Sequence, residues 1–164
     1  MPRIQNQSRH LIIDGYNVIH ACPQLKALLL SGNQDSAREL LIQAAQSIHD
    51  AEDTRVTVVF DGKGPTTTID RPCKELSFSC IFAPSHASAD VILERIILNS
   101  KFPKLVTVAT NDIMILESAR ANGAFTITPT ELFDWIDRAR GGVRRHIKPS
   151  TKKWNTLDFP EAPA

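Results

Sequence analysis

The sequence predicts an α/β fold built on a mostly parallel central sheet of about five strands. Short apolar, β-branched segments recur along the chain and alternate with segments of helical periodicity. Such alternation produces βαβ units, in which helices cover both faces of a parallel sheet. The segments are continuous apolar runs, as burial on both faces requires. The expected strands are residues 11–14, 55–62, 76–82, 104–110 and 124–128.

Helices are expected between and after these strands. Their apolar residues recur at helical spacing on one stripe. Ser88 is a suitable N-cap, Gly123 a suitable C-terminal stop, and residues 128–131 (Thr-Pro-Thr-Glu) place a cap, a proline and an acid in the order that opens a helix. The segment 62–75, rich in Gly, Pro and Thr, is expected to be a loop. The expected helices are residues 36–52, 88–99, 111–123 and 129–138.

Composition indicates one globular domain in the cytoplasm. The 164 residues are 42% hydrophobic and 23% charged, close to ordinary globular values. No apolar segment approaches the roughly 20 residues that span a bilayer, and the first residues lack a signal-peptide core, so no membrane partner is expected. Three cysteines without CxxC spacing indicate reduced thiols. The expected parts are an N-terminal extension (1–9), the domain (10–140) and a basic C-terminal tail (141–164).

Charge is unevenly distributed along the chain. Residues 138–153 contain seven basic residues and no acid, whereas residues 1–137 carry a net charge of −4. An acidic body beside a basic tail suits a protein that holds a polyanion. A solvated tail without a specific role explains the charge alone equally well.

Four aspartates follow the expected strands. Asp14 closes the first strand and Asp61 the second, Asp112 comes two residues after the fourth, and Asp90 lies in the first turn of the helix after the third. Ligands of open parallel sheets bind beyond this carboxyl edge, near the point where strand order reverses. Aspartates at helix starts are also favoured by the helix dipole, so Asp90 and Asp112 each have a capping alternative.

Clustered carboxylates repel one another, and a divalent cation is the usual remedy. Oxygen ligands without His or Cys favour Mg²⁺ or Mn²⁺. Such an ion activates water and orients a phosphodiester. The sequence has no GxxxxGK[ST] loop and no GxGxxG after the first strand, so hydrolysis of a nucleic-acid backbone is favoured over transfer from a nucleotide.

Four short motifs carry a family resemblance. They are Asp14-Gly15-Tyr16-Asn17, Val59-Phe60-Asp61-Gly62, Ser88-Ala89-Asp90 and Thr110-Asn111-Asp112. In this order and spacing, over roughly residues 10–137, they resemble the NYN domains, a branch of the PIN-like nucleases, and most closely the bacterial YacP-like NYN proteins.

The resemblance implies a PIN-like three-layer α/β/α sandwich, a Mg²⁺ or Mn²⁺ site and endonucleolytic cleavage of RNA. Members are linked to RNA processing or decay, some in association with ribosomes. Asn17 would orient a water or a substrate phosphate, and Thr110 would hydrogen-bond a carboxylate. The metal-binding acids would be Asp14, Asp90 and Asp112, with Asp61 in support.

Further residues are candidates for contact with RNA. Tyr16, the single tyrosine, would stack on a base or else pack under the first helix, and Lys63 would contact the backbone or be a solvated surface residue. Glu94, one helical turn after Asp90, is either a fifth acid of the site or the ion-pair partner of a surface Arg or Lys. His86 either contacts the scissile phosphate or lies near the site without a role. The basic tail offers Arg144, Arg145, Lys148, Lys152 and Lys153.

Two other functional classes fit parts of the sequence. An RNA- or ribosome-binding module with little catalysis would share the charge pattern. A phosphatase of the haloacid dehalogenase type would share the strand-Asp motifs, but it needs a second acid two residues after the nucleophile, where this chain has Tyr16. The sequence leaves open whether the protein is a monomer or a homodimer.

Overall fold

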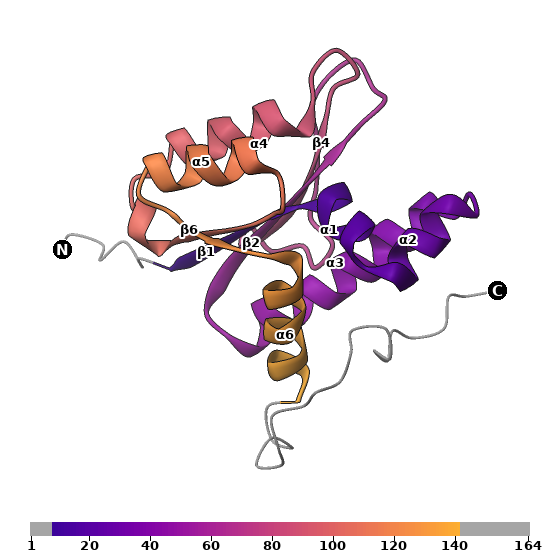
Figure 1. The fold of residues 1–164 in the computed structure, drawn as a ribbon, viewed down its shortest axis with the longest axis horizontal. Coiled ribbons are helices and arrows are strands. Elements are labelled where there is room, and N and C mark those ends of the chain that lie inside the picture. Colours follow the sequence, from indigo (N-terminus) through magenta and orange to yellow (C-terminus); the bar gives the residue numbers. More distant parts are fainter. Residues whose placement is uncertain (1–7, 142–164) are drawn as a thin grey trace.

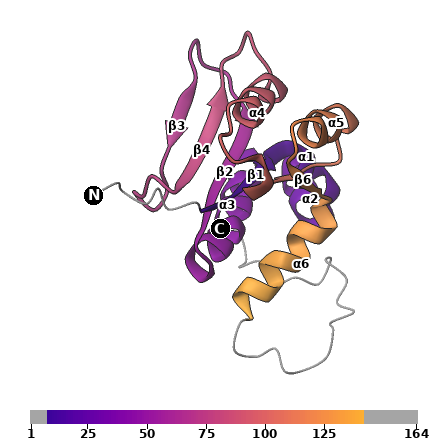
Figure 2. The ribbon, with the colours of Figure 1, turned by 90° about the vertical axis from the view of Figure 1, so that its left-hand side faces the viewer.

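The sheet has six strands in the computed structural model, which describes residues 8–141. The strand order is β3-β4-β2-β1-β5-β6, and Figure 1 shows the ribbon with β1, β2, β4 and β6 labelled. All neighbouring strands are parallel except β3, which pairs antiparallel with β4 at one edge (Figure 2). The strands are β1 (Arg9–Asp14), β2 (Thr54–Asp61), β3 (Thr68–Asp70), β4 (Phe78–Ala83), β5 (Val106–Ala109) and β6 (Phe125–Ile127).

Helices cover both faces of this sheet (Figure 1). Helices α1, α2, α3 and α6 share one hydrophobic core with the sheet, and α4 and α5 share a second core on the opposite face. The helices are α1 (Gly15–Ala21), α2 (Pro23–Leu30), α3 (Gln34–Ala51), α4 (Ala89–Leu98), α5 (Ile113–Ala121) and α6 (Pro129–Arg140), with a 3₁₀ turn at Pro103–Leu105.

The path of the chain explains the two layers of helices. From β1 the chain adds β2 and β4 on one side, then returns to add β5 and β6 on the other side of β1. Right-handed crossovers that run in opposite directions place their helices on opposite faces of the sheet. The strand order therefore reverses between β1 and β5, and a crevice is expected where their carboxyl ends meet.

The central strands are apolar on both faces because both faces are buried. In β1, Leu11 and Ile13 enter the core shared with α3, whereas Ile12 enters the core shared with α4. All three side chains are fully buried. An alternating strand with one polar face would not fit this position.

The structure confirms the predicted α/β sandwich and corrects two details. The segment 62–75 is not entirely a loop, because it contains the short strand β3, and the sheet therefore has six strands in the described part of the chain. Helices α1 and α2 have no counterpart among the expected elements. Within residues 8–141, no helix is both long and apolar enough to cross a bilayer.

Candidate functional site

The carboxyl ends of β1 and β5 are joined by a hydrogen bond between side chains. Asp14 ends β1 and is 6% exposed, and Thr110 follows β5 and is fully buried. The Thr110 hydroxyl donates to Asp14 Oδ2 over 2.9 Å and accepts the backbone N–H of Asp112 over 3.0 Å. Thr110 therefore fixes two of the expected metal-binding acids at the point where strand order reverses.

Asp112 caps the helix that follows. Its Oδ1 accepts the backbone N–H groups of Met114 at 2.9 Å and Ile115 at 3.4 Å, which makes it the N-cap of α5. One of the two carboxylate oxygens of Asp112 therefore caps the helix, as the capping alternative predicts. Within residues 8–141 its Oδ2 accepts no hydrogen bond, which leaves that oxygen available to a ligand.

Asp61 brings the start of α4 to the same edge. Its Oδ1 accepts the backbone N–H of Ala89 over 2.7 Å. Ser88 occupies the N-cap position of α4 as expected, but its side chain makes no capping hydrogen bond. The carboxylate at the end of β2 thus supplies the acceptor, and it holds Asp90 in the first turn of α4 near the other acids.

Two of these carboxylates, Asp14 and Asp90, have raised proton affinities. The pKa of Asp14 is raised to about 6, mainly by burial and further by Asp90, Asp112 and Asp61, against the opposing effect of the Thr110 hydrogen bond. The pKa of Asp90 is raised by partial burial and by Asp112, Asp61 and Glu94. Among the described residues, none of the four aspartates forms an ion pair with Lys, Arg or His. Within residues 8–141, the negative charge of the cluster is therefore not offset by an ion pair.

The donor set fits a hard divalent cation held partly through water. In residues 8–141, no three of these carboxylates have ligand oxygens all within 4.8 Å of one another. Direct coordination by three aspartates would need oxygens closer than this. Mg²⁺ typically retains several waters and takes one or two carboxylates together with substrate phosphates, an arrangement that this spacing permits.

A different group of potential ligands lies at the opposite edge of the sheet. His49, Cys73 and Glu75 have ligand atoms within 4.8 Å of one another. Both ring nitrogens of His49 are already engaged, Nδ1 with Asp50 at 2.9 Å and Nε2 with the Ser77 hydroxyl at 2.7 Å. His49, Ser77 and Glu75 form a hydrogen-bonded network that ties the end of α3 to the segment before β4.

The structure places the remaining predicted residues in different roles around the edge. Asn17 lies in α1, and its Oδ1 accepts the backbone N–H of Asn111 over 2.7 Å, which fastens α1 to the segment after β5. The charge of Glu94 contributes to the raised pKa of Asp90. His86 is exposed. The predicted RNA contacts of the basic tail, Arg144, Arg145, Lys148, Lys152 and Lys153, lie outside the described residues.

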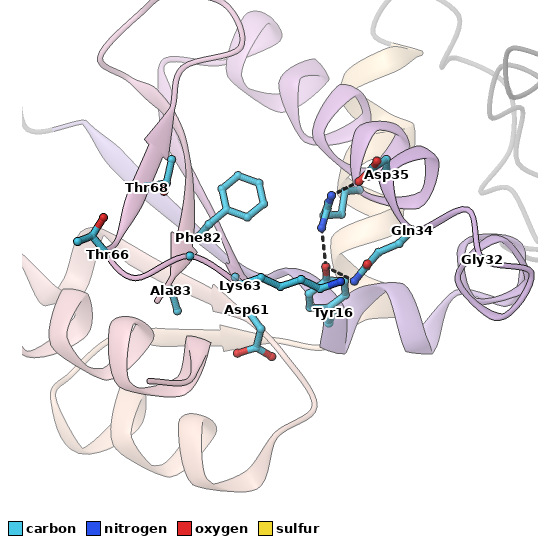
Figure 3. Close-up of a pocket in the computed structure, with 13 residues that line it drawn as sticks. Tyr16, Gly32, Gln34, Asp35, Asp61, Lys63, Thr66, Thr68, Phe82 and Ala83 are labelled. Carbon is cyan, nitrogen blue, oxygen red and sulfur yellow. Dashed lines mark hydrogen bonds and ion pairs between the residues drawn. The ribbon is translucent and has the colours of Figure 1, made fainter. Parts of the chain in front are cut away.

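Tyr16 and Lys63 line a cavity of about 460 Å³ beside the aspartates. The cavity lies between the start of α3 and the loop after β2, and Asp61 belongs to its lining (Figure 3). In Figure 3, Lys63 extends toward Tyr16, whereas the Asp61 carboxylate points away from the Phe82 ring. Arg38 and Phe82 also line the cavity. No sequence motif marked them, because they come from the face of α3 and from β4.

Comparison with known proteins identifies the family. Residues 11–159 match the family model of the YacP-like NYN domain. The chain belongs to the YacP-like NYN domain family. The NYN domains are PIN-like nucleases, and the four aspartates of this NYN domain lie at the carboxyl edge of its sheet.

A relative in Bacillus subtilis resembles this NYN domain over most of its length. The protein YacP is 28% identical over 148 residues, which are 87% of this chain and 84% of YacP. The crystal structure of Rae1 (YacP) is 29% identical, with a TM-score of 0.64 over 83% of this chain and 78% of that chain. A point mutant of Rae1 is 27% identical, with a TM-score of 0.67 over 84% and 80% of the two chains.

Proposed function

We propose that this protein is an endoribonuclease that hydrolyses RNA phosphodiester bonds with the help of bound Mg²⁺ or Mn²⁺. The observation that carries the proposal is the cluster of four aspartates without a cationic partner in the described residues. Membership of a PIN-like nuclease family supports the same conclusion.

The aspartates of the cluster would bind the ion, and Thr110 would orient Asp14. When bound, the ion would lower the pKa of a water and offset the charge of the phosphate. Asp14, Asp90 and the free oxygen of Asp112 would hold it, partly through bound waters, with Asp61 in support. Thr110 holds Asp14 in place, and burial of Asp14 keeps bulk water from competing for its carboxylate.

The replacement of Asp14 by asparagine tests the assignment. Asp14→Asn keeps the size of the side chain and an oxygen that can accept the Thr110 hydroxyl, but removes the charge. Cleavage of single-stranded RNA with Mn²⁺ or Mg²⁺ is expected to fall at least about 100-fold. The matched control is Asp53→Asn, because Asp53 is exposed and lies before β2, at the opposite edge of the sheet.

Two results would contradict the nuclease assignment. One is full cleavage by a folded Asp14→Asn protein. The other is RNA binding in EDTA with no cleavage after either metal is added, which would favour the binding module over the nuclease. Circular dichroism of both variants checks that the fold is retained.

The biological setting proposed is RNA processing or decay in the cytoplasm, with RNA presented free or on the ribosome. The family resemblance supports this setting. Cosedimentation of the inactive Asp14→Asn protein with ribosomes would test the ribosomal part, and the sedimentation velocity of the protein alone would separate a monomer from a homodimer.

A further inference from the structure

We propose that the cavity beside Asp61 binds one unstacked base of single-stranded RNA next to the cleaved phosphate, and that Arg38 is the residue that stacks on this base. The inference rests on the proposed function, because it identifies the feature of RNA that the site would recognise. It assigns a role to Arg38 and Phe82, two lining residues that belong to none of the sequence motifs.

Arg38 is held in one position by three neighbours. Its Nη1 donates to the Tyr16 hydroxyl over 2.9 Å, its Nη2 pairs with Asp35, and its Cζ lies 5.5 Å from the centre of the Phe82 ring. Gln34 donates to the same Tyr16 hydroxyl over 2.6 Å. A guanidinium fixed in this way loses little freedom when a planar ligand stacks on it.

Aromatic rings form a rigid support under this position. Phe82 stacks on Phe60, with centroids 5.6 Å apart and planes inclined by 21°. Tyr16 meets the same Phe60 ring edge-on at 5.2 Å. Because Phe60 is fully buried, the support is continuous with the hydrophobic core. Proteins bind splayed RNA bases on such aromatic and arginine surfaces.

The opposite wall is a loop held close to β4. A Cβ atom at Gly62 would lie 2.3 Å from the Ala83 carbonyl oxygen, so only glycine permits this approach. The Gly64 carbonyl accepts the Ser85 N–H over 2.8 Å. The loop therefore stays close to the strand, with Lys63 on the cavity side, where an ammonium group would attract an RNA phosphate.

The position and the volume of the cavity indicate what it binds. Asp61 belongs both to the lining of the cavity and to the aspartate cluster, so an occupant lies directly beside the proposed cleavage site. The volume of about 460 Å³ falls within the range of small-ligand sites. A paired base in an A-form helix is stacked on its neighbours and inaccessible to such a site, so the geometry requires single-stranded RNA.

A cycle of protein and RNA changes tests the contact. The probes are fluorescent single-stranded oligoribonucleotides in EDTA, each with one abasic residue at a different position, and the dissociation constant is measured by anisotropy. Arg38→Lys keeps the charge but removes the planar group. For the unchanged protein, one abasic position is expected to weaken binding about tenfold. The Arg38→Lys protein is expected to bind intact RNA about tenfold more weakly than the unchanged protein does. Removal of the base at that position is expected to cause no further loss of affinity in this variant.

Matched variants separate this contact from general electrostatics and from folding. Arg55→Lys makes the same change at an exposed arginine on the opposite edge of the sheet, and is expected to keep the full abasic effect. Phe82→Leu keeps an apolar side chain of similar size without the ring, and is expected to reduce the abasic effect as Arg38→Lys does. It serves as the test if Arg38→Lys fails to fold.

The outcomes distinguish the cavity from the catalytic proposal. The base-binding assignment is wrong if no abasic position weakens RNA binding. It is also wrong if the losses of affinity from the abasic RNA and from Arg38→Lys add at every position. Either result counts against it even when Asp14-dependent cleavage is intact. If the coupling is found but neither metal supports cleavage, the nuclease proposal is wrong and the cavity stands as an RNA-binding site.

Discussion

Thr110 illustrates how a single buried hydroxyl organises the acids. It donates to Asp14 and accepts from the backbone of Asp112, so both of its hydrogen-bonding roles are used. Loss of a partner that orients a metal-binding side chain typically costs about 10- to 100-fold in metal affinity or activity. Thr110→Val, which keeps the shape and removes the hydroxyl, is expected to show a loss of that size in Mn²⁺ affinity by calorimetry and in RNA cleavage.

Thr110→Ser is the control for this prediction. Serine restores the hydroxyl and removes only a methyl group, so most of the affinity should return. If valine and serine at this position reduce metal affinity equally, the lost packing is responsible and the orienting role is wrong.

Asp14 is expected to reduce the stability of the metal-free protein at neutral pH. Its pKa is about 6 in the folded chain and 3.8 in the reference state, so the folded state binds more protons between these values. The carboxyl therefore stabilises the fold when it is protonated at low pH, and this contribution is lost as pH rises through 6. In EDTA at pH 8, Asp14→Asn is expected to raise the free energy of unfolding by about 1–3 kcal/mol.

The pH dependence separates this effect from others. The gain of Asp14→Asn over the parent should disappear as pH falls from about 6 toward 4. His10 acts in the opposite direction, because burial and Arg55 lower its pKa from 6.5 to about 4. Between these two pH values, His10 binds fewer protons in the folded state than in the unfolded chain. Since both proteins contain His10, urea titrations of the two across this range isolate Asp14. A gain that does not change with pH would refute the explanation.

At the scale of elements, the junction between β1 and α1 depends on close contact with β2. Gly15 begins α1, and a Cβ atom there would lie 2.3 Å from Phe60 Cε1 and 2.8 Å from the Val59 carbonyl oxygen. Gly15→Ala therefore has to displace a buried ring or backbone. The expected loss is about 1–3 kcal/mol in the free energy of unfolding, measured by denaturant titration, with lower cleavage because Asp14 and Tyr16 move with the junction.

Gly64→Ala is the matched substitution. The nearest atom to a Cβ added at Gly64 would be the Thr66 carbonyl oxygen at 3.8 Å. The free energy of unfolding of this variant should therefore change by less than about 0.5 kcal/mol. Equal losses in the two variants would mean that backbone freedom, and not the contact with Phe60, sets the cost at Gly15.

The central strands and the acid edge could be predicted from the sequence, but the cavity could not. Buried parallel strands leave continuous apolar runs, and an acid at the end of such a run lies at a known edge of the sheet. Strand β3 leaves no such pattern, because Thr68, Ile69 and Asp70 are all exposed. Arg38 and Phe82 meet only through tertiary packing of α3 against β4, which no local motif encodes.

At the scale of the whole molecule, the proposed function requires an acidic site to hold a polyanion. The basic residues of the C-terminal tail are therefore predicted to provide much of the RNA affinity. Arg144→Gln with Arg145→Gln should reduce the slope of log K against log salt by up to about 1.4, at about 0.7 for each lost phosphate contact. Lys101→Gln with Lys104→Gln removes two exposed charges near the opposite edge and should leave the slope unchanged. Equal slopes in the parent and the tail variant would show that the tail is only a solvated extension.

The arrangement of strand lengths has a consequence for behaviour at high concentration. The longest strand, β2, and the strongly apolar β1 lie in the middle of the sheet, whereas the edges are formed by β3 and β6, with three residues each. Such short edges offer few unpaired backbone groups to another chain, which protects a sheet protein from aggregation. Association of folded chains through continued β-pairing is therefore disfavoured at both edges of the described sheet.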